Sequence, residues 1–255
     1  MKQVCIVLLS AFLFLIPAKI FANNIYEITV YHFKNAQQEV TLDTYLQTAY
    51  LPALHRKDKK SIGVFKPIAN DTSADKIIYV IVPFKSLDEI QALQKSLAKD
   101  NIYMETGKNY LTATFQNPPY TRIEKIILTA FETAPEISLP KLNADKKDHV
   151  YELRSYESPT ESYHINKVKM FNSGETNIFT RLNCNPVFYG DVIFGSHMPN
   201  LMYLTSYENM ADRDAHWKSF SDDPQWKQLS GMDEYKNNVS KADVILMHAT
   251  SYSDY

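Results

Sequence analysis

Residues 200–226, NLMYLTSYENMADRDAHWKSFSDDPQW, indicate the fold more clearly than any other stretch of the chain. Asn200–Tyr207 is short and rich in aromatic side chains, which favours a strand covered on both faces. Asn209 stands where a helix N-cap would, because its side-chain oxygen can accept a free amide hydrogen of the first turn. The polar run from Ser221 to Pro224 then ends the helix. We therefore expect a strand followed directly by a helix.

The helix that follows Asn209 carries large side chains at helical spacing. Met210, Arg213, Trp217 and Phe220 fall roughly on one face, so we expect that face to pack on a sheet. A second short helical piece, containing Trp226, is expected to end near Gly231.

Composition limits the kind of protein this is. The chain has 255 residues, of which 45% are hydrophobic and 22% charged, so it can form a core as one large or two small domains. With only 6 glycines it is poor in phosphate-binding loops, and its net charge of -2 without a long basic run argues against nucleic acid as a partner.

The first residues resemble a secretory signal. Lys2 precedes the apolar run Val4–Ile16, which is too short for a comfortable membrane span. Pro17 breaks the run, and Ala22 offers a cleavage site before Asn23. We expect residues 1–22 to be a cleaved signal peptide and the mature protein to be secreted or periplasmic, without a stable membrane span. The alternative is an uncleaved N-terminal anchor.

Cleavage would also remove one of the 2 cysteines and leave only Cys184. A single cysteine can form no internal disulfide, so stability must come from packing. We interpret Cys184 as a buried small hydrophobe and not as a nucleophile.

The first half of the mature chain follows a β-α-β-β-α-β order, which is the ferredoxin-like pattern. The predicted strands are Ile25–Phe33, Ile62–Ile68, Lys76–Phe84 and Arg122–Phe131. The predicted helices are Asp43–His55, which Pro52 would kink or shorten, and a helix capped by Ser86 that ends near Ala98.

The second half repeats this plan at a nearly constant spacing along the chain. The sequence VYELRSY at Val150–Tyr156 matches IYEITVY at Ile25–Tyr31. In the same way Tyr203 matches Tyr79, and the helix containing Lys218–Phe220 matches the one containing Lys95–Leu97. The repeated elements are strands at Val150–Tyr156, Asn185–Phe194, Asn200–Tyr207 and Lys241–Tyr252, with helices at Tyr163–Phe179 and after Asn209.

Two diverged modules follow from this repeat. We expect an N-terminal module at residues 23–134, a linker at 135–148 and a C-terminal module at 149–255. A four-stranded sheet with both helices on one face leaves the other face bare, and the nearest cover is the other sheet. The predicted fold is therefore α+β, with two ferredoxin-like modules packed sheet to sheet as a barrel within one chain. We expect a monomer, while weak dimerisation through the helices stays open.

The C-terminal module resembles the NIPSNAP family. The resemblance rests on the opening strand Val150–Tyr156, on Tyr203–Tyr207 with the turn after it, and on Arg213, Trp217 and the Asp-Pro-x-Trp motif ending at Trp226. The N-terminal module resembles the family weakly and has Gln94 where Trp217 stands. The resemblance implies the dimeric α/β-barrel superfamily and no settled activity; related barrels include small monooxygenases.

Candidate ligand-binding residues lie on the first strand of the C-terminal module and around it. Alternation places Glu152, Arg154 and Tyr156 on one face of the strand. An arginine beside a glutamate can line a cavity and hold an anionic ligand, or it can form a structural ion pair. The full candidate set is Glu152, Arg154, Tyr156, Tyr203, His216 and Trp217. Trp217 is more often a core anchor than a ligand platform, and His216 points about 100° away from it around the helix.

Motifs for metal or covalent catalysis are missing. The histidines show no HxxxH spacing, and the sequence contains neither CxxC nor GxSxG. We expect no metal and no cofactor, and we assign no catalytic residue. The preferred interpretation is an exported binding or interaction protein with a pocket for a small apolar or anionic molecule. One alternative is a cofactor-independent monooxygenase or isomerase acting on a phenol or quinol, and another is a scaffold whose barrel is filled by side chains.

Overall fold

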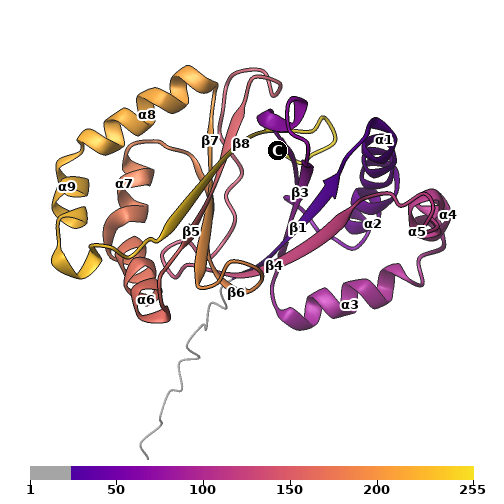
Figure 1. The fold of residues 1–255 in the computed structure, drawn as a ribbon, viewed down its shortest axis with the longest axis horizontal. Helices are drawn as coiled ribbons and strands as arrows, with labels where there is room; N and C mark the ends of the chain where they lie inside the picture. The colour runs from indigo at the N-terminus through magenta and orange to yellow at the C-terminus, as the bar shows by residue number, and fades with distance from the viewer. Residues whose placement is uncertain (1–23) are drawn as a thin grey trace, which may run out of the picture.

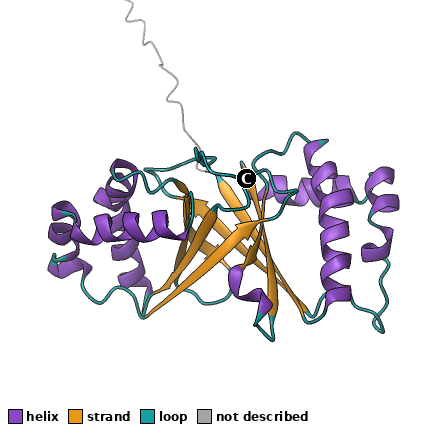
Figure 2. Ribbon diagram, turned by 90° about the horizontal axis from the view of Figure 1, so that it is seen from above, coloured by secondary structure: helices purple, strands orange, loops and turns teal. Residues whose placement is uncertain are grey.

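A computed structural model of the protein describes residues 24–255 (Figure 1). The predicted signal peptide lies outside the described residues. The described chain forms two β-α-β-β-α-β modules whose sheets join into one central barrel, with helices at both ends (Figure 2).

The N-terminal module contains four strands, and its helices lie on one side of them (Figure 1). Its strands are β1 (Ile25–Phe33), β2 (Gly63–Pro67), β3 (Lys76–Phe84) and β4 (Arg122–Ala130). Its helices are α1 (Ala36–Tyr45), α2 (Leu51–His55), α3 (Leu87–Leu97), α4 (Asn101–Thr106) and α5 (Lys108–Leu111).

The C-terminal module repeats this arrangement. Its strands are β5 (Val150–Glu157), β6 (Pro186–Phe194), β7 (Asn200–Tyr207) and β8 (Lys241–Ala249). Its helices are α6 (Glu161–Met170), α7 (Thr176–Arg181), α8 (Met210–Asp222) and α9 (Pro224–Ser230). No helix within residues 24–255 is both long enough and apolar enough to cross a membrane.

The eight strands form a closed barrel in the order β1-β3-β2-β8-β5-β7-β6-β4. All strand pairs are antiparallel, and two of them join the modules: β2 pairs with β8, and β4 pairs with β6. Each module thereby closes the open edges of the other, as predicted for a pseudo-dimer within one chain.

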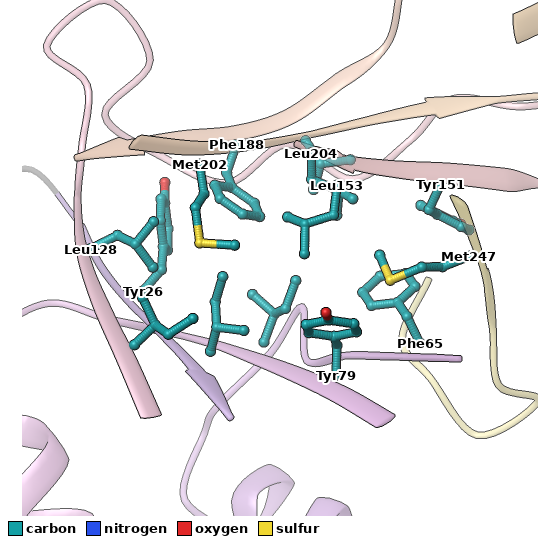
Figure 3. Close-up of a cluster of buried hydrophobic side chains, with 14 of the residues drawn as sticks. Tyr26, Phe65, Tyr79, Leu128, Tyr151, Leu153, Phe188, Met202, Leu204 and Met247 are labelled. Atoms are coloured by element: carbon teal, nitrogen blue, oxygen red, sulfur yellow. The ribbon is translucent and has the colours of Figure 1, made fainter. Parts of the chain in front are cut away.

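Apolar side chains occupy the interior of the barrel (Figure 3). Tyr26 and Phe65 of the N-terminal module point inward, and Tyr151, Leu153 and Phe188 approach from the C-terminal module. These residues are almost completely buried. The interior is therefore a hydrophobic core shared by both modules.

Two separate clusters pack the outer faces of the sheets against the helices. One cluster joins β1 and β3 to α1–α4, and the other joins β6 and β7 to α7 and α8. Each helical layer therefore belongs to one module, and sites between helices and sheet can differ from one module to the other.

The first helix starts earlier than the sequence pattern predicted. The side chain of Asn35 accepts a hydrogen bond from the backbone nitrogen of Gln38 at 2.9 Å, so α1 begins at Ala36 and not at Asp43. A π-helical turn, Leu46–Tyr50, connects α1 to α2. Pro52 lies in the first turn of α2, where its missing amide hydrogen is tolerated.

One match of the predicted repeat was wrong by one residue, and one residue predicted on the packed face of the helix after Asn209 lies outside it. The ladders pair Arg154 with Tyr203 and Thr29 with Val80, so Val80 is the counterpart of Tyr203. Tyr79 instead faces the barrel interior, because a shift of one residue turns a strand side chain to the other face. Met210 was expected on one face of α8 with Arg213, Trp217 and Phe220. It is 39% exposed and lies outside the packed part of that face.

Candidate functional site

β5 carries the centre of the predicted site. Its residues alternate, so Tyr151 and Leu153 face the barrel while Glu152, Arg154 and Tyr156 lie under the helices of the C-terminal module. β7 pairs with β5 and brings Tyr203 opposite Arg154. α8 begins at Met210, where Asn209 caps the first turn through a 3.0 Å hydrogen bond from the Asp212 backbone nitrogen, and its large side chains pack on this part of the sheet.

Glu152 is the hub of these side chains and is 0% exposed. Its Oε1 accepts hydrogen bonds from Arg154 Nε at 2.5 Å and Arg213 Nη2 at 3.1 Å. Its Oε2 accepts from Arg213 Nε at 2.6 Å and Trp217 Nε1 at 2.8 Å. Burial alone would raise the pKa of Glu152, but the hydrogen bonds and charges of the two arginines lower it overall.

Arg154 connects this carboxylate to the aromatic layer. Its guanidinium carbon lies 3.7 Å from the centre of a Trp217 ring, a stacked cation–π arrangement. Its Nη1 donates to the Tyr156 hydroxyl at 2.9 Å, which in turn lies 2.9 Å from the Tyr203 hydroxyl. Burial raises the pKa of Tyr203 well above its ordinary value, so this phenol is neutral at physiological pH.

A second buried ion pair lies nearby. Lys167 Nζ donates to Glu175 Oε2 at 2.9 Å, and both side chains are almost fully buried. Burial raises the pKa of Glu175 although Lys167 counteracts it. Both acidic groups in this layer are therefore already engaged by cations of the chain itself.

His216 lies apart from the other five predicted residues. Its ring packs 5.8 Å from the Tyr207 ring, and Nδ1 lies 2.9 Å from the Asp212 backbone oxygen. The structure thus brings together Glu152, Arg154, Tyr156, Tyr203 and Trp217 but directs His216 elsewhere, as expected for neighbouring positions on a helix. The polar groups of these five side chains are bonded within the C-terminal module, where Arg213 supplies two further donors to Glu152.

The corresponding layer of the N-terminal module is different, because it contains a cavity. Glu27 occupies the position on β1 that Glu152 occupies on β5, and its side chain is 5% exposed. It lines a cavity of about 350 Å³ between the sheet and the helices. Ile90 and Gln94 on α3 also line it, and they stand where α8 has Arg213 and Trp217.

The distance along the chain from the helix cap supports this equivalence. Ser86 caps α3 as Asn209 caps α8, and Gln94 follows Ser86 by as many residues as Trp217 follows Asn209. Gln94 is exposed and lies at the wall of the cavity, as does the partly exposed Met104. The cavity therefore exists where the C-terminal module places an indole and a guanidinium.

Tyrosines dominate the cavity wall. Tyr31 comes from β1, Tyr45 and Tyr50 from the first helix and the π-helical turn, and Tyr103 and Tyr110 from α4 and α5. The rings of Tyr45 and Tyr110 stack at 3.8 Å, and the hydroxyls of Tyr45 and Tyr103 are 2.8 Å apart. Burial raises the pKa of all five, so their hydroxyls stay protonated at neutral pH.

The sequence patterns did not reveal this cavity, although a signal for it was present. Glu27 matches Glu152 in the repeat, while Gln94 replaces Trp217 with a smaller side chain. A carboxylate that both modules share, with the covering indole present in only one of them, indicates empty space in the other.

Neither metal binding nor thiol chemistry gains support from the described residues. Within residues 24–255, no three His, Cys, Asp or Glu side chains are grouped so that they could hold a metal ion. Cys184 is 1% exposed, and burial raises its pKa to about 12, so it is an inert core residue at neutral pH.

Comparison with known proteins assigns the C-terminal module to a family. Residues 151–254 match the NIPSNAP family model, so this part of the chain is a NIPSNAP domain. A comparison with curated proteins gives no match. The solved structure of a NIPSNAP-like domain protein from Burkholderia xenovorans is 16% identical and covers 42% of this chain and 90% of its own, with a TM-score of 0.37.

Two solved structures are similar along most of the chain, and both carry the name "putative monooxygenase". The one from Fusobacterium nucleatum has a TM-score of 0.61 at 6% identity, covering 90% of this chain and 94% of its own. The one from Lactobacillus acidophilus has a TM-score of 0.58 at 13% identity, covering 89% and 94%. At these identities the likeness establishes the shared barrel fold alone.

Proposed function

We propose that this chain, whose C-terminal module is a NIPSNAP domain, is an exported protein that binds a small molecule in its N-terminal module. The observation that carries the proposal is the cavity of about 350 Å³ between α3, α4 and the sheet. Its size falls in the range of small-ligand sites, and its wall combines aromatic rings with few polar groups, as such sites do.

The C-terminal module supports this assignment by contrast. Trp217 and Arg213 fill the same position there and bind Glu152 directly. The candidate residues Arg154 and Tyr156 are bound by the chain itself, so in this proposal they stabilise the NIPSNAP domain while the N-terminal module binds the ligand. A division of roles between two copies of one module explains why one position is filled and the other empty.

Export forms part of the proposal because of the N-terminal sequence. The apolar run Val4–Ile16 and the small residue Ala22 fit a cleaved signal peptide. An exported binding protein meets its ligand outside the cytoplasm.

Catalysis is the second candidate, favoured by the carboxylate of Glu27 in the cavity wall. In that case Glu27 would accept a proton from a phenol or quinol, a chemistry in keeping with the monooxygenase names of the two fold neighbours. Binding is preferred because the cavity wall is mainly aromatic and apolar and because Glu27 is already paired with Lys125. Oxygen uptake with a hydroquinone would favour catalysis.

The binding proposal is tested with indole, the side chain that the C-terminal module places at this position. We expect indole to bind the wild-type chain in calorimetry and to raise its melting temperature. Gln94→Trp should abolish binding because its own indole would enter the cavity, as that of Trp217 does over Glu152.

The matched control is Lys95→Trp, which adds the same ring one position along α3 at an exposed residue outside the cavity wall. It should leave indole binding unchanged. Equal indole affinity in wild type and Gln94→Trp would show that the cavity is not the site. Native mass spectrometry of protein from its own host should then identify the natural ligand, retained by Lys95→Trp and lost by Gln94→Trp.

A further inference from the structure

The two equivalent glutamates of the modules differ in the number of cations they bind. Glu152 pairs with two guanidinium groups, those of Arg154 and Arg213. Glu27 pairs with one cation, the Lys125 ammonium, whose Nζ lies 2.5 Å from Oε1. The fold thus holds a buried carboxylate with two cations in one module and with one in the other.

The shared cation can be traced through the strand register. Thr29 stands at the position of Arg154 and pairs with Lys125 on β4, while Arg154 pairs with Val244 on β8. In the N-terminal module this cation therefore lies on the neighbouring strand, and Lys125 pairs with Glu27 as Arg154 pairs with Glu152. The position of the other cation, Arg213, is taken by Ile90, which has no charge.

The missing cation leaves one oxygen of Glu27 without a partner. Oε1 accepts from Lys125 and lies 3.5 Å from the Thr29 hydroxyl, while Oε2 accepts no hydrogen bond from any residue in 24–255. In Glu152 the same oxygen accepts from Arg213 Nε and Trp217 Nε1. This oxygen is open to the cavity that Glu27 lines, so a ligand in the cavity could supply the donor that the chain does not.

Building on the proposed function, we propose that the ligand of the N-terminal cavity is an organic cation with a flat aromatic part. Its ammonium or amidinium group binds Glu27 Oε2, and its ring lies among the tyrosines. The ligand would thus supply the two groups that Arg213 and Trp217 supply to Glu152 in the other module.

Tyrosine rings suit such a ligand for two reasons. Their faces attract a cation, and a cation between Glu27 and the rings would gain from both interactions. Tyr31 and Tyr50 line the same cavity as Glu27, so the wall that the carboxylate faces is aromatic.

The test uses three ligands that share the indole ring system and differ in charge. At neutral pH tryptamine is cationic, 3-ethylindole is neutral and indole-3-acetate is anionic. Their affinities for the mature chain are measured by calorimetry. We expect tryptamine to bind about tenfold more tightly than 3-ethylindole, and indole-3-acetate to bind most weakly.

Two variants address the carboxylate directly. Glu27→Gln should bring tryptamine to within about twofold of 3-ethylindole, since it removes only the charge. Ile90→Arg should do the same by placing a guanidinium where Arg213 stands in α8, and it tests the idea even if Glu27→Gln folds poorly. Asp88→Asn is the matched control, because Asp88 is an exposed acid on α3 that does not line the cavity.

The outcomes separate the two proposals. Equal binding of tryptamine and 3-ethylindole, or a tryptamine preference that survives in Glu27→Gln and Ile90→Arg, would overturn the cationic ligand. The binding function itself would still stand if 3-ethylindole binds wild type and not Gln94→Trp. Failure of all three ligands to bind would overturn the proposed function as well.

Discussion

Replacing Trp217 with alanine should destabilise the protein by about 3–4 kcal/mol. Complete removal of a buried tryptophan ring typically costs about 3–5 kcal/mol, and Trp217 is partly exposed, which places the packing loss near the lower end. The lost contacts include the Phe179 and Phe220 rings at 5.7 and 5.5 Å and the stacked Arg154 guanidinium. Glu152 also loses one of its donors while it stays buried, which costs about 1 kcal/mol or more.

Urea titration followed by circular dichroism measures this loss. Trp217→Phe keeps most of the ring but removes the indole N–H, so we expect about 1–2 kcal/mol. Lys218→Ala is the control on the same helix, because its side chain is 80% exposed and should change stability by less than about 0.5 kcal/mol. A loss below about 1 kcal/mol for Trp217→Ala would refute the view that this ring anchors α8 to the sheet.

Further predictions concern charge, reactivity, assembly and export. The partners of Glu152 lower its pKa in the folded state below the ordinary 4.5, so the ionised carboxylate stabilises the fold above pH 4.5. This contribution is lost as the pH falls through the folded pKa. The difference in unfolding free energy between wild type and Glu152→Gln should therefore shrink from pH 7 to pH 3. Cys184, buried and with a pKa of about 12, should react with a thiol-specific dye only after unfolding, and a rapid reaction of the native protein would contradict its burial. Light scattering should give the mass of one chain, and separately expressed residues 23–134 and 148–255 should associate when mixed; two stable monomers that ignore each other would contradict the shared barrel. N-terminal sequencing of exported protein should begin at Asn23, whereas an intact Met1 in the membrane fraction would exclude cleavage.

The elements with strong local patterns could be predicted closely. The strand Asn200–Tyr207 and the caps Ser86 and Asn209 occur as expected, because alternation and capping depend on neighbouring residues. The closed barrel followed from the repeat, because two bare sheet faces must cover each other. The error that matched Tyr203 with Tyr79 arose because aromatic side chains occur on both faces of these strands, so similarity alone did not fix the register.

The candidate site was harder to predict than the fold. Glu152, Arg154 and Tyr156 could be assigned to one face of a strand, but whether that face is open or filled depends on what α8 places over it. The cavity of the N-terminal module depends on five tyrosines from separate elements and on the small size of the residue at position 94. No local pattern reports such a convergence, because it arises only when distant segments pack together.

Joining the two modules in one chain has a consequence for how their sites can diverge. In a barrel made from two identical chains, symmetry forces every substitution to occur twice, so a residue that opens a pocket also removes packing from the other half. Here Gln94 and Trp217 occupy the same position in different modules, and each can change alone. The N-terminal module can therefore lose packing at this position and gain a ligand cavity, while the C-terminal module keeps Trp217 packed between α8 and the sheet.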